Sequence, residues 1–133
     1  MNIKDFYSRK KEEIEEKARD ILLSCISGRF PLEEFNRWRE RNTSKIIDLS
    51  NMDLSDKHLS YLNLENAILS GSNLNGTDLR GCNLRGASFR GAKFNERTTL
   101  NEANIWGAKG LPQEILERYI NELREFIYRE RGW

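Results

Sequence analysis

Residues 67–91 read AILSGSNLNGTDLRGCNLRGASFRG, five groups of five residues with a large apolar residue at the third place of each group. Counted outward in both directions, this spacing holds for ten consecutive centres. The centres are Leu49, Leu54, Leu59, Leu64, Leu69, Leu74, Leu79, Leu84, Phe89 and Phe94. A period of five suits neither regular element, because such residues wander around a helix and alternate between the faces of a flat strand. The pattern predicts a chain that turns a corner every five residues, so that all centres point into one shared interior.

The neighbours of each centre favour a narrow, filled interior. From Ala67 onward the residue two places before each centre is small, as at Ser72, which leaves room beside a large inward side chain. The residue two places after each centre is glycine from Gly71 to Gly91, where a corner needs a permissive backbone. The intervening polar positions are expected to face water.

The segments AILSG, SNLNG, TDLRG, CNLRG and ASFRG resemble the A(D/N)LXX motif of the pentapeptide-repeat family. The resemblance implies an all-β solenoid core, a right-handed quadrilateral β-helix with four pentads in each coil. Members of this family abound in cyanobacteria, and some of them act in regulation through protein contacts. Residues 46–111 provide about three coils, and residues 1–45 and 112–133 are expected to form α-helical caps on the open ends of the solenoid.

Two departures from the period carry information. Six positions separate Phe94 from the next centre, Leu100, after which Ile105 resumes the register and completes the predicted core. We therefore expect a one-residue bulge near residues 95–97. Lys57 occupies an inward slot of the first coil, where an unpaired buried charge would cost several kcal/mol. Either this slot is open to water or the first coil is irregular.

Both flanking segments show apolar patterns with helical spacing. In the N-terminal segment the pattern is formed by Ile3, Tyr7, Ile14, Ala18, Ile21, Leu22 and Cys25. A second short helix is predicted from Pro31 to Arg41. After Pro112, a broad apolar face is formed by Ile115, Leu116, Tyr119, Ile120, Leu123, Phe126 and Ile127. This face predicts packing on the last coil, with a dimer contact or a partner groove as the alternative, so monomer and homodimer both remain open.

Composition limits the classes of partner. The chain has 22 Lys and Arg against 21 Asp and Glu, and this balance gives no long-range field that would steer it to nucleic acid or membranes. The first 25 residues lack the unbroken apolar stretch of a signal peptide, and no run is long enough to span a membrane, so we expect a cytoplasmic protein. Cys25 and Cys82 lack CxxC spacing, which favours two buried or half-buried free thiols over a disulfide.

The sequence contains no recognisable catalytic, cofactor-binding or metal-binding motif. His58 is the single histidine and occupies an outward slot, where an ordinary exposed residue is expected. The glycines recur at corners instead of forming a phosphate-binding loop. Arg80, Arg85 and Arg90 lie in successive pentads, and therefore on different faces of a four-sided coil, which argues against a nucleic-acid groove. The sequence therefore predicts that the protein is not an enzyme and has neither cofactor nor metal.

One column of the predicted solenoid is a candidate binding surface. Residues twenty apart, or twenty-one across the bulge, would stack, which places Glu65, Arg85 and Trp106 above one another. The column offers an ion pair and an arginine near an aromatic ring, and Trp and Arg are enriched in binding hot spots. The alternative is an ordinary surface ladder. Together with Tyr119 and Phe126 of the C-terminal helix, these residues are the candidate protein-binding set.

The leading functional hypothesis is a non-catalytic scaffold that binds another protein, and the sequence does not identify that partner. The alternative is a DNA-mimic inhibitor of a topoisomerase, gyrase, as in one branch of the family that forms long acidic rods. This chain is short and nearly neutral, which disfavours that alternative. An enzyme with an unrecognised site would need a convergent polar pocket, for which a filled solenoid offers little room.

Overall fold

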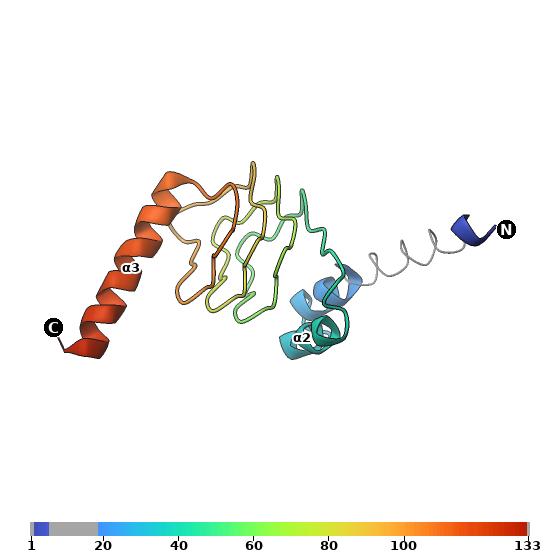
Figure 1. Cartoon of the computed structure of the whole chain (residues 1–133), viewed down its shortest axis with the longest axis horizontal. Coiled ribbons are helices and arrows are strands. Elements are labelled where there is room, and N and C mark those ends of the chain that lie inside the picture. The colour runs from blue at the N-terminus through green and yellow to red at the C-terminus, as the bar shows by residue number, and fades with distance from the viewer. Residues whose placement is uncertain (1, 6–18, 133) are drawn as a thin grey trace.

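The computed structural model describes residues 2–5 and 19–132. Residues 3–5 and 19–26 are helical, α2 spans Leu32–Arg41, and α3 spans Gln113–Arg131. Between α2 and α3 the chain forms a stack of similar loops, with helices at both ends of the stack (Figure 1). The N-terminal positions Tyr7, Ile14 and Ala18 of the predicted apolar face lie outside the described residues. Of the described positions on that face, Leu22 and Cys25 are buried and Ile3 is exposed.

The stack is built from two coils of twenty residues and a third of twenty-one. Parallel β-bridges join residues twenty apart, such as His58 with Asp78, and successive bridges follow at steps of five. The Leu59 amide donates to the Asp78 carbonyl at 2.8 Å, and the Asp78 amide donates to the Lys57 carbonyl at 2.9 Å. The coils cover residues 47–66, 67–86 and 87–107. Within the described ranges these pairings remain isolated bridges and do not extend into strands of a sheet, which is less β-structure than the predicted all-β core.

Corners recur every five residues and need a positive φ. In the first coil they are occupied by Asn51, Asp56, Tyr61 and Asn66, and in the second coil by Gly71, Gly76, Gly81 and Gly86. A Cβ atom at any of these four glycines would overlap the side chain of the first-coil residue stacked on it. Glycine at these corners therefore provides both the left-handed backbone and the space for the neighbouring side chain.

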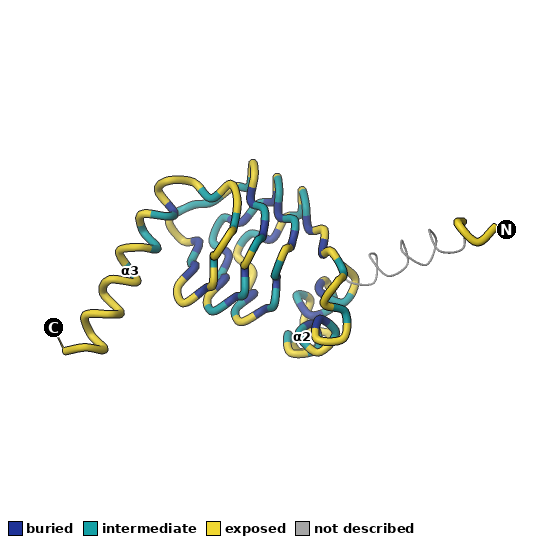
Figure 2. The backbone as a smooth tube through the Cα atoms, viewed as in Figure 1, coloured by how far each residue is buried: buried dark blue, intermediate teal, exposed yellow. Residues whose placement is uncertain are grey.

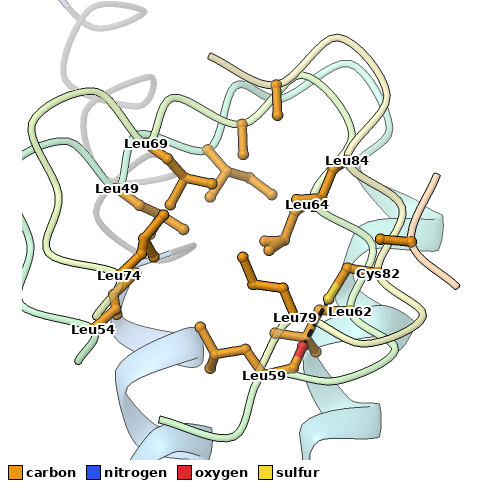
Figure 3. Packing of buried hydrophobic residues seen from close by; sticks show 14 of the residues in the cluster. Leu49, Leu54, Leu59, Leu62, Leu64, Leu69, Leu74, Leu79, Cys82 and Leu84 are labelled. Atoms are coloured by element: carbon orange, nitrogen blue, oxygen red, sulfur yellow. Dashed lines mark hydrogen bonds between the residues drawn. The ribbon is translucent and has the colours of Figure 1, made fainter. Parts of the chain in front are cut away.

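The centres fill the interior of the stack (Figures 2 and 3). Of the twelve predicted core residues, ten are buried, from Leu49 to Phe89 and again at Leu100. Phe94 and Ile105 are only half-buried, whereas Phe89 and Leu100 of the same last coil are buried, so the end of the stack is covered unevenly. The small inward positions also carry polar groups, and the Thr77 hydroxyl donates to the Leu54 carbonyl at 2.8 Å. The Thr98 hydroxyl and the Cys82 thiol also donate to carbonyls of the preceding coil, whereas the Ser72 hydroxyl donates to the Leu69 carbonyl of its own coil, so each of these buried groups is paired with backbone.

The predicted bulge is confirmed. Asn73 pairs with Lys93, twenty residues on, whereas Asp78 pairs with Thr99, twenty-one residues on. The Asn95 side chain accepts from the Gly76 amide at 2.9 Å, so it replaces a backbone carbonyl where the extra residue enters. The backbone of Lys57 pairs regularly with the next coil, so the first coil is not irregular there. The Lys57 side chain is exposed, so its slot is open to water.

Side chains of α2 complete the open edge of the first coil. Arg39 is buried, and its guanidinium donates to the carbonyl of Glu65 at 2.8 Å. The Asn36 amide oxygen accepts from the Asn63 amide at 2.8 Å, and its nitrogen donates to the Tyr61 carbonyl at 2.8 Å. These groups take the place of a preceding coil, because they pair backbone that would otherwise form a free edge.

At the other end, α3 pairs carbonyls of the last coil. The Tyr119 hydroxyl donates to the Ala103 carbonyl at 2.7 Å, and Arg118 donates to the carbonyls of Glu96 and Thr98. In the preceding coil the equivalent carbonyls, those of Thr77 and Cys82, accept backbone amides. The first two turns of α3 are thereby fixed to the stack.

The prediction that the whole apolar face of α3 packs on the last coil is wrong for its C-terminal half. Ile115 is buried and Leu116 and Tyr119 are half-buried. Four further members of the face are exposed, namely Ile120, Leu123, Phe126 and Ile127. The helix leans away from the stack beyond its first turns, so only its beginning can contact the last coil (Figure 1).

Candidate protein-binding surface

The candidate column is held in place by asparagines. Asn63 bridges Asn83, and Asn83 bridges Asn104, so the residues two places later in each coil also stack. In all three coils the asparagine Oδ1 accepts the backbone amide of that later residue, at 3.2 Å for Glu65 and Arg85 and 3.0 Å for Trp106. This local bond fixes the backbone that carries each candidate side chain.

The three side chains of the column behave differently. Arg85 is exposed, and Trp106 has 74% of its surface exposed. Glu65 is half-buried and lies close enough to the Arg39 guanidinium to act on its pKa, which burial lowers and the Glu65 charge raises. Within the described part of the chain, neither the Glu65–Arg85 ion pair nor a ring contact between Arg85 and Trp106 is formed. The exposed part of the column is therefore an unpaired cation beside an uncovered indole.

Tyr119 and Phe126 lie elsewhere. Tyr119 is engaged by its bond to Ala103, and desolvation raises the pKa of its phenol. Phe126 is half exposed and lines a groove of about 650 Å³ between α3 and a corner of the last coil. That corner carries Glu102, whose carboxylate lies 3.5 Å from the Arg80 guanidinium. The candidate set thus divides into the column and the groove along α3.

The repeated geometry has a counterpart among known proteins. A family model described as pentapeptide repeats matches residues 58–95 in eight copies. This segment is a run of pentapeptide repeats. The match lies within a longer series of coils, because the bridges start at Asp48 and end at Lys109. A search of the curated proteins finds no match for the chain.

Pentapeptide repeats are typically interaction modules and are generally non-enzymatic. The outward positions of the repeats in this chain carry side chains that are at least partly exposed to solvent, such as His58. The His58 ring has 87% of its surface exposed, and its Nδ1 lies 3.9 Å from Asp78. No three His, Cys, Asp or Glu residues gather in a metal-binding arrangement within residues 2–5 and 19–132. None of the helices in these ranges is long and apolar enough to cross a membrane.

The Cys82 thiol is enclosed by the pentapeptide repeats. It is fully buried and donates to the Leu59 carbonyl at 2.9 Å. Desolvation raises the pKa of Cys82 from 9.0 to about 12. The folded protein therefore keeps a proton that the unfolded chain releases between these values, and this group lowers stability as pH rises through that range. Cys25 is also free and buried, and its pKa is likewise raised by burial.

We expect both thiols of the native protein to resist a thiol-specific chromophoric reagent at pH 8 and to react at once in denaturant. The measurement is the rate of colour development in each state. Replacing Cys82 by Ser should weaken the fall in stability between pH 9 and 12, which denaturant titrations at several pH values would show. Fast reaction of both thiols in the native state would contradict their burial.

Proposed function

We propose that this protein is a non-catalytic scaffold whose coils form a right-handed quadrilateral β-helix and whose exposed column binds another protein. The contact is centred on Trp106 and Arg85. The partner presents an apolar recess for the indole beside a carboxylate for the guanidinium. The family's general use of pentapeptide repeats as interaction modules supports the class of function.

The observation that carries this proposal is the exposed indole on a fixed backbone. The Trp106 amide is bound by Asn104 Oδ1 at 3.0 Å, and its carbonyl accepts from the Gly86 amide at 2.9 Å. Its side chain is 74% exposed and makes no hydrogen bond to any described residue. Trp has only two side-chain torsion angles, so this large side chain loses little conformational entropy on binding. Trp and Arg are both enriched in binding hot spots.

The surface also has the charge that the stated partner requires. Arg85 is exposed and forms no ion pair with a carboxylate among residues 2–5 and 19–132. A cation that is free before binding gives up no existing ion pair when it meets an acidic group. The column therefore favours an acidic, apolar epitope over the phosphate backbone of a nucleic acid, which would need several aligned cations.

The test is capture of partners from nuclease-treated lysate with immobilised protein, followed by mass spectrometry. We expect Trp106→Ala and Arg85→Glu each to reduce the captured partner by at least about tenfold, as for hot-spot residues. Arg90→Glu is the matched control, since it makes the same charge change in the next pentad and should leave capture intact. Equal capture by all three variants and the wild type would exclude the column as the binding surface.

A further inference from the structure

The exposed flank of α3 has the spacing of a helix-pairing seam. Leu116, Ile120, Leu123 and Ile127 follow one another at steps of four, three and four residues, which is the spacing of core positions in paired helices. Ile120, Leu123 and Ile127 expose 47%, 45% and 41% of their surfaces. Figure 2 shows α3 as exposed over most of its length. We call these four residues the α3 seam.

The stack of the same chain does not cover the α3 seam. The side of α3 that faces the last coil carries Ile115 and Tyr119, and Tyr119 is bonded to Ala103. The residues of the seam lie about a quarter to a third of a turn further around the helix, since each residue advances the helix by about 100°. Because the start of α3 is fixed to the stack, the helix cannot rotate about its axis. The side with Ile115 and Tyr119 stays on the stack, and the α3 seam stays uncovered.

The charges beside the seam indicate which occupant fits. If two copies of α3 lie antiparallel with Leu116 against Ile127 of the second copy, Ile120 meets Leu123 of that copy. This register places Glu117 opposite Arg124 of the second copy, and the two-fold symmetry repeats the pair. Tyr119 then lies beside Phe126 of the second copy. The apolar layers and the charges therefore match in one register.

The two charged residues are available for this contact. Both are exposed. Among the described residues, Glu117 bonds only within its own helix, where its Oε1 accepts from Gln113 Nε2 at 3.1 Å. Arg124 has no hydrogen bond or ion pair with any described residue. A parallel arrangement would place Arg124 near Tyr119 of the second copy and would leave Glu117 without a cation, so the charges favour the antiparallel arrangement.

We propose that the protein forms a symmetric homodimer in which the α3 seams of two copies pair antiparallel, with Glu117 of each copy facing Arg124 of the other. α3 is already formed and fixed at its beginning, so pairing does not require folding of a helix. The contact uses neither Trp106 nor Arg85, and the dimer would therefore present two copies of the candidate column.

The test is sedimentation equilibrium of charge-reversal variants. Glu117→Arg and Arg124→Glu each turn two attractive contacts of the dimer into repulsive ones, and we expect each to weaken self-association about tenfold. The double variant should restore it. An equimolar mixture of the two single variants should form a heterodimer, because each copy then supplies the charge that the other lacks. Glu125→Arg, on the opposite side of α3 and also exposed, is the matched control.

A second variant tests the apolar seam itself. Leu123→Asp should give a monomer with an unchanged far-ultraviolet circular dichroism spectrum, because Leu123 is exposed in the single chain. A wild-type protein that stays monomeric at about 100 μM, well above the micromolar range of modest protein contacts, would overturn the proposal. A dimer that is insensitive to Leu123→Asp, or that the double charge reversal fails to restore, would overturn it equally.

Discussion

Arg39→Ala is expected to lower the free energy of unfolding by about 3 kcal/mol, because it removes the guanidinium donor from three part-buried carbonyl oxygens. The guanidinium donates to the carbonyls of Asn42 at 3.0 Å, Lys45 at 2.8 Å and Glu65 at 2.8 Å. It thus ties the end of α2, the following turn and the first coil to one another. The side chain is also among the largest that are fully buried, so its removal leaves a cavity as well. Urea denaturation followed by circular dichroism measures the change.

Arg37→Ala is the matched control for this prediction. Arg37 lies on the same helix, but its side chain is mostly exposed, and its one ion pair within the described part of the chain is with Glu34 one turn away. Its loss is expected to change stability by less than about 0.5 kcal/mol. Arg39→Lys should fall between the two, because an ammonium group cannot reproduce the planar fork that reaches three carbonyls. If Arg39→Ala were no more destabilising than Arg37→Ala, the capping role of Arg39 would be refuted.

Leu79→Ala is expected to destabilise the protein by about 3 kcal/mol, within the range for leucines removed from tightly packed cores. Leu79 is fully buried in the second coil, where its amide donates to the Thr99 carbonyl and the Leu59 amide donates to the Asp78 carbonyl. Figure 3 shows Leu59 and Leu79 directed into the same interior. With coils on both sides, the backbone around Leu79 has little freedom to collapse into the cavity.

The same substitution at Leu23 serves as its control. Leu23 lies in the helical segment 19–26 and exposes 44% of its surface. Alanine is a good helix former, so we expect Leu23→Ala to cost less than about 1 kcal/mol. Equal losses at the two leucines in denaturant titrations would mean that the interior of the coils is not packed as described.

The packing of the interior could be predicted from the sequence, because the pattern that specifies it is local and repeated. Each centre has the same neighbours at the same spacing, and a single break in the period was enough to place the bulge near Asn95. The half-burial of Phe94 and Ile105 was not predictable from the period, because it depends on where the series of coils ends. The first-coil corners were also missed, since asparagine, aspartate and tyrosine adopt positive φ there without the glycine signature.

The residues that close the ends were harder to find in the sequence. Arg39 lies one helical turn after Phe35, on the apolar side of α2. A cation on that side of the helix is the sequence signal that Arg39 would be buried. Asn36 and Arg118 look like ordinary surface residues, because their backbone partners lie far away in the sequence. The Glu65–Arg85 ion pair was expected from stacking alone, but the charge of Glu65 acts on the guanidinium of Arg39, a neighbour that stacking does not predict. Contacts between a helix and a coil edge thus depend on tertiary placement that no periodicity encodes.

Disulfide formation between engineered cysteines tests the twenty-residue register on which the column, the caps and the interior all depend. Backbones in adjacent coils lie about 4.8 Å apart, which is within the Cα separation that a disulfide spans. In the wild-type background, whose buried thiols stay reduced, His58→Cys/Asp78→Cys replaces a bridged pair, and His58→Cys/Lys93→Cys joins two different columns. We predict that mild oxidation gives an intramolecular disulfide, seen by intact mass, in the first variant and none in the second. A disulfide in the second variant with none in the first would contradict the coil register.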